Sequence, residues 1–252
     1  IKEFLHLDVM TVTGKTLGEN LEELKRNGYY ERCYAELEKC NLKKEDIIKT
    51  VANPIQKQGA LAILKGNLAP EGAVIKHSAV PKEMREAVLI ARPFNSEEEA
   101  IKAVLTGEIN PGDAVIIRYE GPKGSGMPEM FYTTEAIASD PRIAASTALI
   151  TDGRFSGASR GPAIGHVSPE ATEGGPIALV EEGDLIKISV SERKLSIIGV
   201  NNRELPEEEI EKILVERKKN WKKPEPRFNK GPLAVYTRFA VSPMKGGYIE
   251  VK

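Results

Sequence analysis

The stretch DAVIIRYEG, residues 113–121, decides what kind of sheet this chain builds. Its four apolar residues, Ala114–Ile117, stand between Asp113 and Arg118. Such a short apolar run bounded by polar residues is typical of a strand that is buried on both faces. Glycines and prolines crowd the residues that follow, 121–128, and predict a loop. We therefore expect a buried strand whose carboxyl end leads into an irregular loop.

Further short strands are expected on both sides of this one. Serine and glutamate at Ser96 and Glu99 have the capping-box spacing and predict a helix that Gly107 ends. A second helix is expected from Pro206 to Lys219, because acidic residues come first and basic residues last, as the helix dipole favours. The apolar runs that predict strands are 60–64, 73–76, 88–91, 146–151, two runs around a Glu-Glu-Gly turn within 175–190, and 194–200.

These elements predict the fold class. Short strands outnumber helices, whereas a doubly wound parallel sheet would alternate strand and helix. We expect a mixed β/α fold with a barrel-like β core and flanking helices. Residues 1–55 read as a short helical segment, with a capping box at Thr16 and Glu19 and a helix end near Gly28. The tail from Trp221 to Lys252 is expected to wrap the surface.

Composition narrows the classes of protein. The chain has 252 residues, 40% of them hydrophobic and 29% charged, with a formal net charge of −1. Neither sign of charge dominates, which argues against nucleic acid and membrane surfaces as partners. No apolar run approaches the roughly 20 residues of a membrane span, and no signal peptide is visible. Only two cysteines, Cys33 and Cys40, are present, and they predict ordinary reduced thiols in a cytoplasmic protein.

Two loops have compositions that a core does not need. The first, YEGPKGSGMPEM (119–130), offers Glu120 and Glu129, and a loop carboxylate can bind a hard cation such as Mg²⁺. The second, TDGRFSGASRG (151–161), presents Ser156 among small residues whose backbone N–H groups could hold an anion. Solvated glutamates and a small-residue turn are the plainer interpretations, and both stay open on spacing alone.

The histidines add no clear candidate for catalysis or metal binding. A Ser-His-Asp relay through Asp152 and His166 is conceivable, but their spacing has no mechanical meaning. His6, His77 and His166 are scattered and do not form a ligand cluster. We expect His166 to make structural hydrogen bonds near the second loop.

The stretch ALITDGRFSGASRGPAIGHVSPEATEGGPIALVEEGDLIKI (148–188) resembles the C-terminal signature of the dihydroxy-acid dehydratase / 6-phosphogluconate dehydratase family. So do GALAILKGNLAPEGAVIK (59–76), VIIRYEGPKGSGMPEM (115–130) and, more loosely, DVMTVTGKTLGENL (8–21). The resemblance extends to about Trp221. The chain begins at Ile1 rather than Met, and we interpret it as a fragment that matches the C-terminal half of the family.

The resemblance implies a function. Members are iron–sulfur, Mg²⁺-dependent hydro-lyases that dehydrate a 2,3-dihydroxy acid or sugar acid to a 2-keto acid. It implies that Glu129 is a Mg²⁺ ligand and that Ser156 is the base. The backbone N–H groups that follow Ser156, those of Gly157 and Ala158, are expected to bind the substrate carboxylate. The cluster ligands would lie in the missing N-terminal domain, and neither Cys33 nor Cys40 matches them.

The resemblance also implies an organisation. Residues 1–55 would belong to the missing N-terminal domain or to a linker, and 56–252 would form a swivelling β-barrel domain with a C-terminal helix and tail. A homodimer is expected, and the isolated fragment is expected to be inactive.

Two alternatives to the leading function stay open. A branched-chain precursor acid of valine and isoleucine biosynthesis leads as substrate, and a sugar acid such as 6-phosphogluconate or an aldonate is second. The alternative of another class is a non-catalytic β-barrel binding module.

Overall fold

The computed structural model describes residues 2–157 and 161–251. The chain divides into two compact units, one ending at Gly59 and the other beginning at Ala60. Within the described ranges, no helix has the length and apolar character that a membrane crossing requires.

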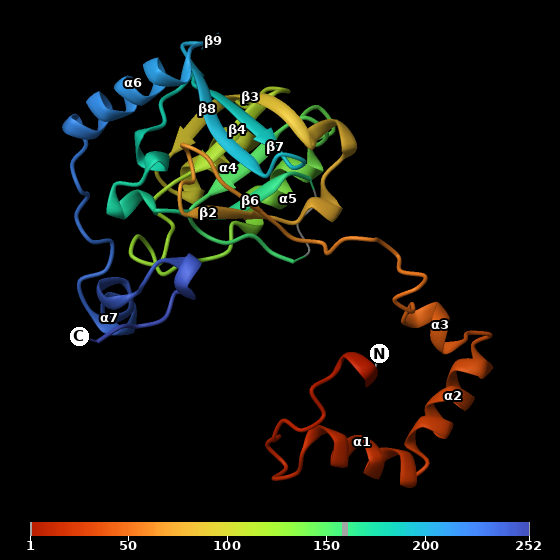
Figure 1. Ribbon diagram of the computed structural model, residues 1–252. Coiled ribbons are helices and arrows are strands. Elements are labelled where there is room, and N and C mark those ends of the chain that lie inside the picture. The colour runs from red at the N-terminus through yellow and green to blue at the C-terminus, as the bar shows by residue number, and fades with distance from the viewer. Residues whose placement is uncertain (1, 158–160, 252) are drawn as a thin grey trace. The chain divides into compact units, whose positions relative to one another are not determined.

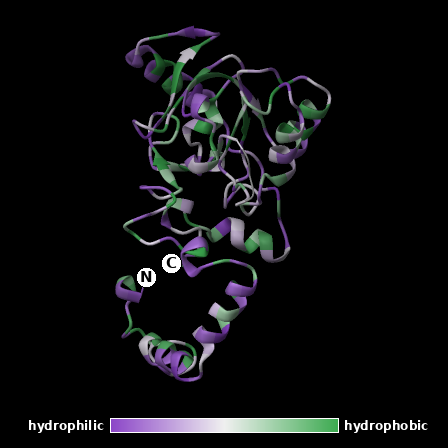
Figure 2. Ribbon diagram, turned by 90° about the vertical axis from the view of Figure 1, so that its right-hand side faces the viewer, coloured by the Kyte–Doolittle hydropathy of each residue, from purple (hydrophilic) through white to green (hydrophobic). Residues whose placement is uncertain are grey.

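The first unit is helical. It contains a 3₁₀ turn at Lys2–Phe4 and helices α1 (Leu17–Arg26), α2 (Tyr29–Lys39) and α3 (Lys44–Ile47). The predicted capping box is confirmed, because Thr16 Oγ1 accepts from Glu19 N and the Glu19 carboxylate accepts from Thr16 N. None of its described residues is buried, so this unit has no hydrophobic core of its own among the described residues. Hydropathy colouring shows hydrophilic and hydrophobic residues alternating along these helices (Figure 2).

The second unit is built on one curled sheet of nine strands (Figure 1). Their order across the sheet is β1-β2-β6-β5-β4-β3-β7-β8-β9. The four strands β3, β4, β5 and β6 run parallel, and the flanking pairs are antiparallel. The strands are β1 (Ala62–Leu64), β2 (Gly72–Ile75), β3 (Glu86–Phe94), β4 (Asp113–Ile117), β5 (Ala148–Thr151), β6 (Ala163–Ser168), β7 (Leu185–Ser189), β8 (Lys194–Val200) and β9 (Arg203–Glu204).

The curl brings the two ends of the sheet together. Directly after β1, Lys65 forms a parallel bridge with Lys194 at the start of β8. The Asn67 side chain extends this backbone pairing, because it donates to Ile197 O (2.8 Å) and accepts from Ile197 N (2.7 Å). Gly66 lies between them, where a Cβ would overlap the carbonyl oxygen of Leu195. The close approach of the two backbones therefore requires glycine at this position.

Strand β4 separates two hydrophobic cores. Ala114 and Ile116 point into the large core enclosed by the sheet. Val115 and Ile117 point to the other face, into a smaller core beneath α4 (Glu97–Leu105) and α5 (Phe131–Ser139). Side chains alternate across a strand, so burial on both faces explains the uninterrupted apolar run of 114–117.

Helices α4 and α5 connect the parallel strands β3, β4 and β5. Ser96 caps α4 as predicted, accepting from Glu99 N at 3.2 Å. The Glu99 carboxylate accepts from Asn95 N instead of Ser96 N, so the reciprocal half of the capping box is shifted by one residue.

The C-terminal helices are α6 (Glu207–Asn220) and α7 (Gly231–Phe239). Arg217 of α6 forms a two-pronged ion pair with the buried Asp184, at 2.6 and 2.9 Å, which fixes α6 to the strand β7 side of the sheet. Trp221 follows α6 and donates from Nε1 to the Tyr119 hydroxyl at 3.2 Å. The remaining short 3₁₀ turns are His77–Ala79, Lys82–Met84, Ala171–Glu173, Pro176–Leu179 and Pro243–Lys245.

The mixed fold class and its curled sheet agree with the sequence, but several elements differ. The first predicted strand within 175–190 is wrong, because Pro176–Leu179 forms a 3₁₀ turn. Strand β6 and helices α5 and α7 were not predicted. The centre of the sheet is parallel with helical crossovers, a feature that the count of short strands did not indicate. The swivelling motion and the domain assignment stay predictions.

We predict that Gly66→Ala disrupts the contact between β8 and the segment that follows β1, which closes the curled sheet. The added methyl group would overlap the backbone of β8, and overpacking of this kind costs about 1–3 kcal/mol of unfolding free energy. Urea unfolding followed by circular dichroism measures the loss. Gly59→Ala is the control, because a Cβ there meets nothing within 4 Å. Equal midpoints for the two variants would contradict the closure.

Candidate functional site

Two irregular loops leave the same edge of the sheet. Strands β4 and β5 are parallel neighbours, with Ile117 paired to Thr151 at their carboxyl ends. The chain therefore enters the loop 118–130 and the loop 152–157 side by side. Loops at the carboxyl ends of parallel strands are a common location for binding and catalytic residues.

A buried carboxylate fastens these loops to each other. Asp152 is fully buried and accepts from the backbone N–H groups of Tyr119 (3.2 Å), Glu120 (2.9 Å) and Ala171 (2.8 Å). Burial raises the pKa of Asp152 to about 6, although its three backbone donors act in the opposite direction. The donors belong to the segments that follow β4 and β6, so one side chain ties three segments together.

A second buried carboxylate, from the segment that follows β6, binds the backbone of the first loop. Glu170 accepts from the backbone N–H groups of Lys123 and Gly124, each at 3.0 Å. Burial raises the pKa of Glu170 to about 7. A Cβ at Gly121 would overlap the Glu170 carboxylate, so this approach depends on glycine. Tyr119 and Met127, in the same loop, have positive φ values of 67° and 61°, a costly conformation for such side chains.

The predicted metal-binding residue Glu129 lies where the two loops touch. Glu129 forms a parallel backbone bridge with Arg154 of the second loop. Met130 N donates to Arg154 O at 2.8 Å, and Arg154 N donates to Pro128 O at 3.0 Å. The Arg154 guanidinium donates to Met127 O at 2.7 Å. The Glu129 side chain is exposed, and its carboxylate has no hydrogen bond or ion pair in the described part of the chain.

The predicted base Ser156 lies two residues beyond that bridge and is half-buried. Phe155 packs its ring edge-on against His166, with centroids 6.2 Å apart. On the other side, the Lys76 ammonium donates to Gly157 O at 2.6 Å. Ser156 is thus flanked by two fixed residues and lies on the same short segment as the bridge to Glu129. Gly157 is exposed, and Ala158, the other predicted substrate-binding residue, falls outside the described residues.

Two other candidates suggested by the sequence turn out to be structural. Glu120 is only 1% exposed, and its carboxylate accepts from Ser125 Oγ and from Arg227, so it is not an available metal ligand. The relay through Asp152 and His166 is wrong, because the Asp152 carboxylate is occupied by backbone N–H groups and His166 Nδ1 is buried without a hydrogen-bond partner among the described residues. Burial lowers the pKa of His166, and the nearby Arg154 acts in the same direction.

Several residues that shape the site were not recognised in the sequence. The acidic residues Asp152 and Glu170 directly follow or lie close after buried strands, and that position is a usable signal. Lys76 and Arg227 carry no such signal, since their partners are 81 and 107 residues away. Across residues 2–157 and 161–251, no group of three or more His, Cys, Asp or Glu side chains could hold a metal ion. Cys33 and Cys40 are free thiols.

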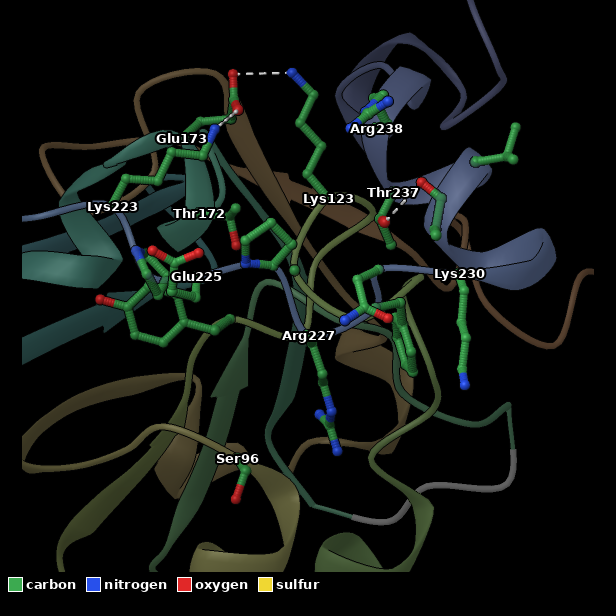
Figure 3. Close-up of a pocket in the computed structure, with 18 of the residues that line it drawn as sticks. Ser96, Lys123, Thr172, Glu173, Lys223, Glu225, Arg227, Lys230, Thr237 and Arg238 are labelled. Atoms are coloured by element: carbon green, nitrogen blue, oxygen red, sulfur yellow. Dashed lines mark hydrogen bonds and ion pairs between the residues drawn. The ribbon is translucent and has the colours of Figure 1, made fainter.

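A cavity of about 1300 Å³ lies beside the first loop, between it and the C-terminal segment (Figure 3). Basic side chains line it, and most are paired. Lys123 and Lys223 both reach Glu173, at 3.0 and 3.5 Å. Arg227 reaches Glu98 at 3.3 Å. Neither Glu129 nor Ser156 lines this cavity.

Comparison with known proteins gives one consistent result. The family profile described as dihydroxy-acid/6-phosphogluconate dehydratase, C-terminal, matches residues 46–247. A protein named dihydroxy-acid dehydratase from Caldanaerobacter subterraneus subsp. tengcongensis is 49% identical over 243 residues, which cover 96% of this chain and 39% of that protein. Its namesake from Acetivibrio thermocellus is 48% identical over 252 residues, covering 100% of this chain and 41% of that protein. Dihydroxy-acid dehydratase 1 of Methanosarcina acetivorans is 48% identical over 247 residues, covering 98% and 40%.

The chain therefore spans about 40% of the length of these relatives. The matched region contains both loops of the candidate site, and the identity is high over nearly all of this sequence. This chain accordingly belongs to the dihydroxy-acid/6-phosphogluconate dehydratase family, of which it represents the C-terminal part.

Proposed function

We propose that this chain is the C-terminal part of a hydro-lyase that converts a 2,3-dihydroxy acid into a 2-keto acid. The observation that carries the proposal is the backbone bridge between Glu129 and Arg154. It brings an exposed carboxylate and the segment that presents Ser156 to one edge of the sheet. The names of the relatives, dihydroxy-acid dehydratase, support the reaction class.

The donor chemistry of Glu129 fits a magnesium ion. Its carboxylate is exposed and has no partner in the described ranges, and Mg²⁺ prefers hard anionic oxygen. One carboxylate cannot hold the ion alone, so we assign the other ligands to the part of the protein outside this chain. When bound, Mg²⁺ would withdraw electron density from the substrate carboxylate and C2 oxygen and make the C2 proton more acidic.

This chain does not fit an iron–sulfur cluster. Such clusters are held by several thiolates, and the chain has only Cys33 and Cys40, both on or next to α2 in the first unit. The cluster in our proposal is therefore bound by the N-terminal domain. The helical first unit, which has no buried described residue, supports a close association with further protein.

Ser156 is the proposed base, and its Oγ would accept the C2 proton. A serine hydroxyl is a weak base in water, but nearby positive charge favours its ionised form. In our proposal this charge comes from Arg154, two residues before Ser156 in the sequence, and from Lys76, whose ammonium donates to Gly157 O. Backbone N–H groups of Gly157 and Ala158 are the proposed partners of the substrate carboxylate.

The branched-chain precursor acid of valine and isoleucine biosynthesis is the proposed substrate. The names of the relatives favour it over a sugar acid. A cytoplasmic homodimer completes the proposal. The non-catalytic binding module is disfavoured, since relatives at 46–49% identity bear the names of enzymes.

We predict that the isolated chain 1–252 has no dehydratase activity, because it supplies one Mg²⁺ ligand and no cluster ligands. Turnover of 2,3-dihydroxyisovalerate is measured with Mg²⁺ present, after circular dichroism has shown that the fragment is folded. The full-length protein is the positive control. Turnover by the folded fragment alone would favour a site complete within this chain.

We predict that Glu129→Gln in the full-length protein weakens Mg²⁺ binding and leaves the fold intact, since an amide lacks the negative charge of the carboxylate. The Kd for Mg²⁺ and the melting temperature are measured together. Glu135→Gln is the matched control, because Glu135 is an exposed glutamate of α5 close to Glu129. An unchanged Mg²⁺ requirement would remove Glu129 from the metal site.

We predict that Ser156→Ala in the full-length protein lowers kcat by about 100-fold or more, because a positioned base contributes at least this much. KM should change less, and the melting temperature should barely move. Ser139→Ala, at the exposed end of α5, is the control for loss of a hydroxyl. A near-normal kcat would mean that Ser156 only shapes the loop and that the base lies elsewhere.

A further inference from the structure

Three glutamates gather where the first loop meets helix α4. Glu97 and Glu98 occupy the first turn of α4, and Glu97 N donates to Glu120 Oε1 at 3.3 Å. Glu120 is 1% exposed, and glutamate side chains are almost never buried to this extent unless they are paired. Burial raises the pKa of Glu97, and the neighbouring Glu120 and Glu98 act in the same direction. This acidic cluster therefore needs a compensating cation.

Arg227 supplies that cation from the C-terminal segment between α6 and α7. Its Nη1 donates to both oxygens of Glu120, at 2.9 and 3.1 Å, and its Nη2 reaches Glu98 at 3.3 Å. Figure 3 shows the Arg227 side chain extending from that segment toward Ser96, which caps α4. In the described part of the chain, no other cation lies within ion-pair distance of the cluster.

The same cluster holds the loop on both sides of Glu129. Before Glu129, Ser125 Oγ donates to the Glu120 carboxylate. After it, Thr133 at the start of α5 donates to Glu97 Oε1 from both N (3.2 Å) and Oγ1 (3.3 Å). The segment that carries Glu129 is thus attached at two points, one on either side of Glu129, to the cluster of Glu97, Glu98, Glu120 and Arg227.

From this arrangement we infer that Arg227 is a positioning residue for Glu129, and that the C-terminal segment fastens the 120–133 segment through the Glu120–Arg227 ion pair. The consequence for metal binding rests on the proposed function, whereas the fastening itself does not. Arg227 acts through Glu120 and Ser125 and does not itself contact the substrate or the metal.

The physical reason is the burial of Glu120. The Arg227 side chain is 43% exposed and that of Glu120 only 2%, so removing Arg227 leaves the buried carboxylate without its cation, and a buried charge without a partner is more costly than the loss of an ion pair exposed on both sides. Glu120 must then move toward water, and that movement disturbs its bond to Ser125. Residues that orient a metal ligand typically change metal affinity by about 10- to 100-fold when they are substituted.

The test uses the full-length protein with Arg227→Gln, Arg227→Lys and the double variant Glu120→Gln/Arg227→Gln. Arg238→Gln is the matched control, because Arg238 lines the same cavity and has no ion pair among the described residues. Hydrogen exchange is measured at Gly124, Ser125 and Met127, whose backbone N–H groups bond to Gly121 O. The Kd for Mg²⁺, kcat at saturating Mg²⁺ and the melting temperature are measured on the same samples.

We expect Arg227→Gln to accelerate exchange in the loop but not in β7 and β8, and to raise the Kd for Mg²⁺ by about 10-fold or more, with a smaller change in kcat at saturating Mg²⁺. Arg227→Lys should retain part of the affinity, because it keeps the charge but cannot span Glu120 and Glu98. The double variant should recover part of both losses, since no buried charge is left unpaired.

The inference is overturned if exchange in the loop after Arg227→Gln matches that after Arg238→Gln. If Arg227→Gln does not fold, the other two variants decide the question. The inference is then overturned if the loop of Arg227→Lys exchanges hydrogen at the wild-type rate and the double variant regains neither the slow loop exchange nor the affinity for Mg²⁺. Faster loop exchange with an unchanged Kd for Mg²⁺ would support the fastening but would overturn Arg227 as a positioning residue for Glu129, whereas Glu129→Gln tests separately whether Glu129 is a metal ligand.

Discussion

The candidate site depends on one buried carboxylate, that of Asp152. It lies at the end of β5 and accepts three backbone N–H groups from the segments that follow β4 and β6. These segments are irregular, so their N–H groups have no strand partner and would be costly to bury unsatisfied. Asp152 satisfies them and simultaneously sets the spacing between the loops. The positions of Glu129 and Ser156 follow from that spacing and from the backbone bridge at Arg154.

The same solution recurs around the first loop. Glu170 and Glu120 also direct carboxylates at groups of the 119–130 loop, Glu170 at two backbone N–H groups and Glu120 at the Ser125 hydroxyl. Charge-assisted hydrogen bonds of this kind are stronger than neutral ones, which suits a loop that contains the strained residues Tyr119 and Met127. The loop is therefore held by carboxylates at several points, and its one exposed carboxylate without a partner among the described residues is that of Glu129.

Local sequence alone determined the elements whose pattern is unambiguous. The apolar run at 114–117, the strand at 194–200, and the caps at Thr16 and Ser96 were all predictable, because each depends on residues close together in the chain. The family signature likewise identified both loops of the candidate site. Where the pattern was ambiguous, prediction failed. Gly165 and His166 interrupt the apolar pattern of β6, and the short apolar run of Pro176–Leu179 fits a strand as well as a 3₁₀ turn.

Tertiary structure decided everything that depends on distant partners. Nothing in the sequence indicates that Asn67 closes the sheet against Ile197, 130 residues away, or that Arg227 neutralises Glu120, 107 residues away. Glu120 and Glu129 lie in the same loop and are the same residue type, yet one is buried in an ion pair and the other is exposed. Their roles differ because burial and charge pairing are properties of the folded chain, and only the arrangement of its segments in space assigns them.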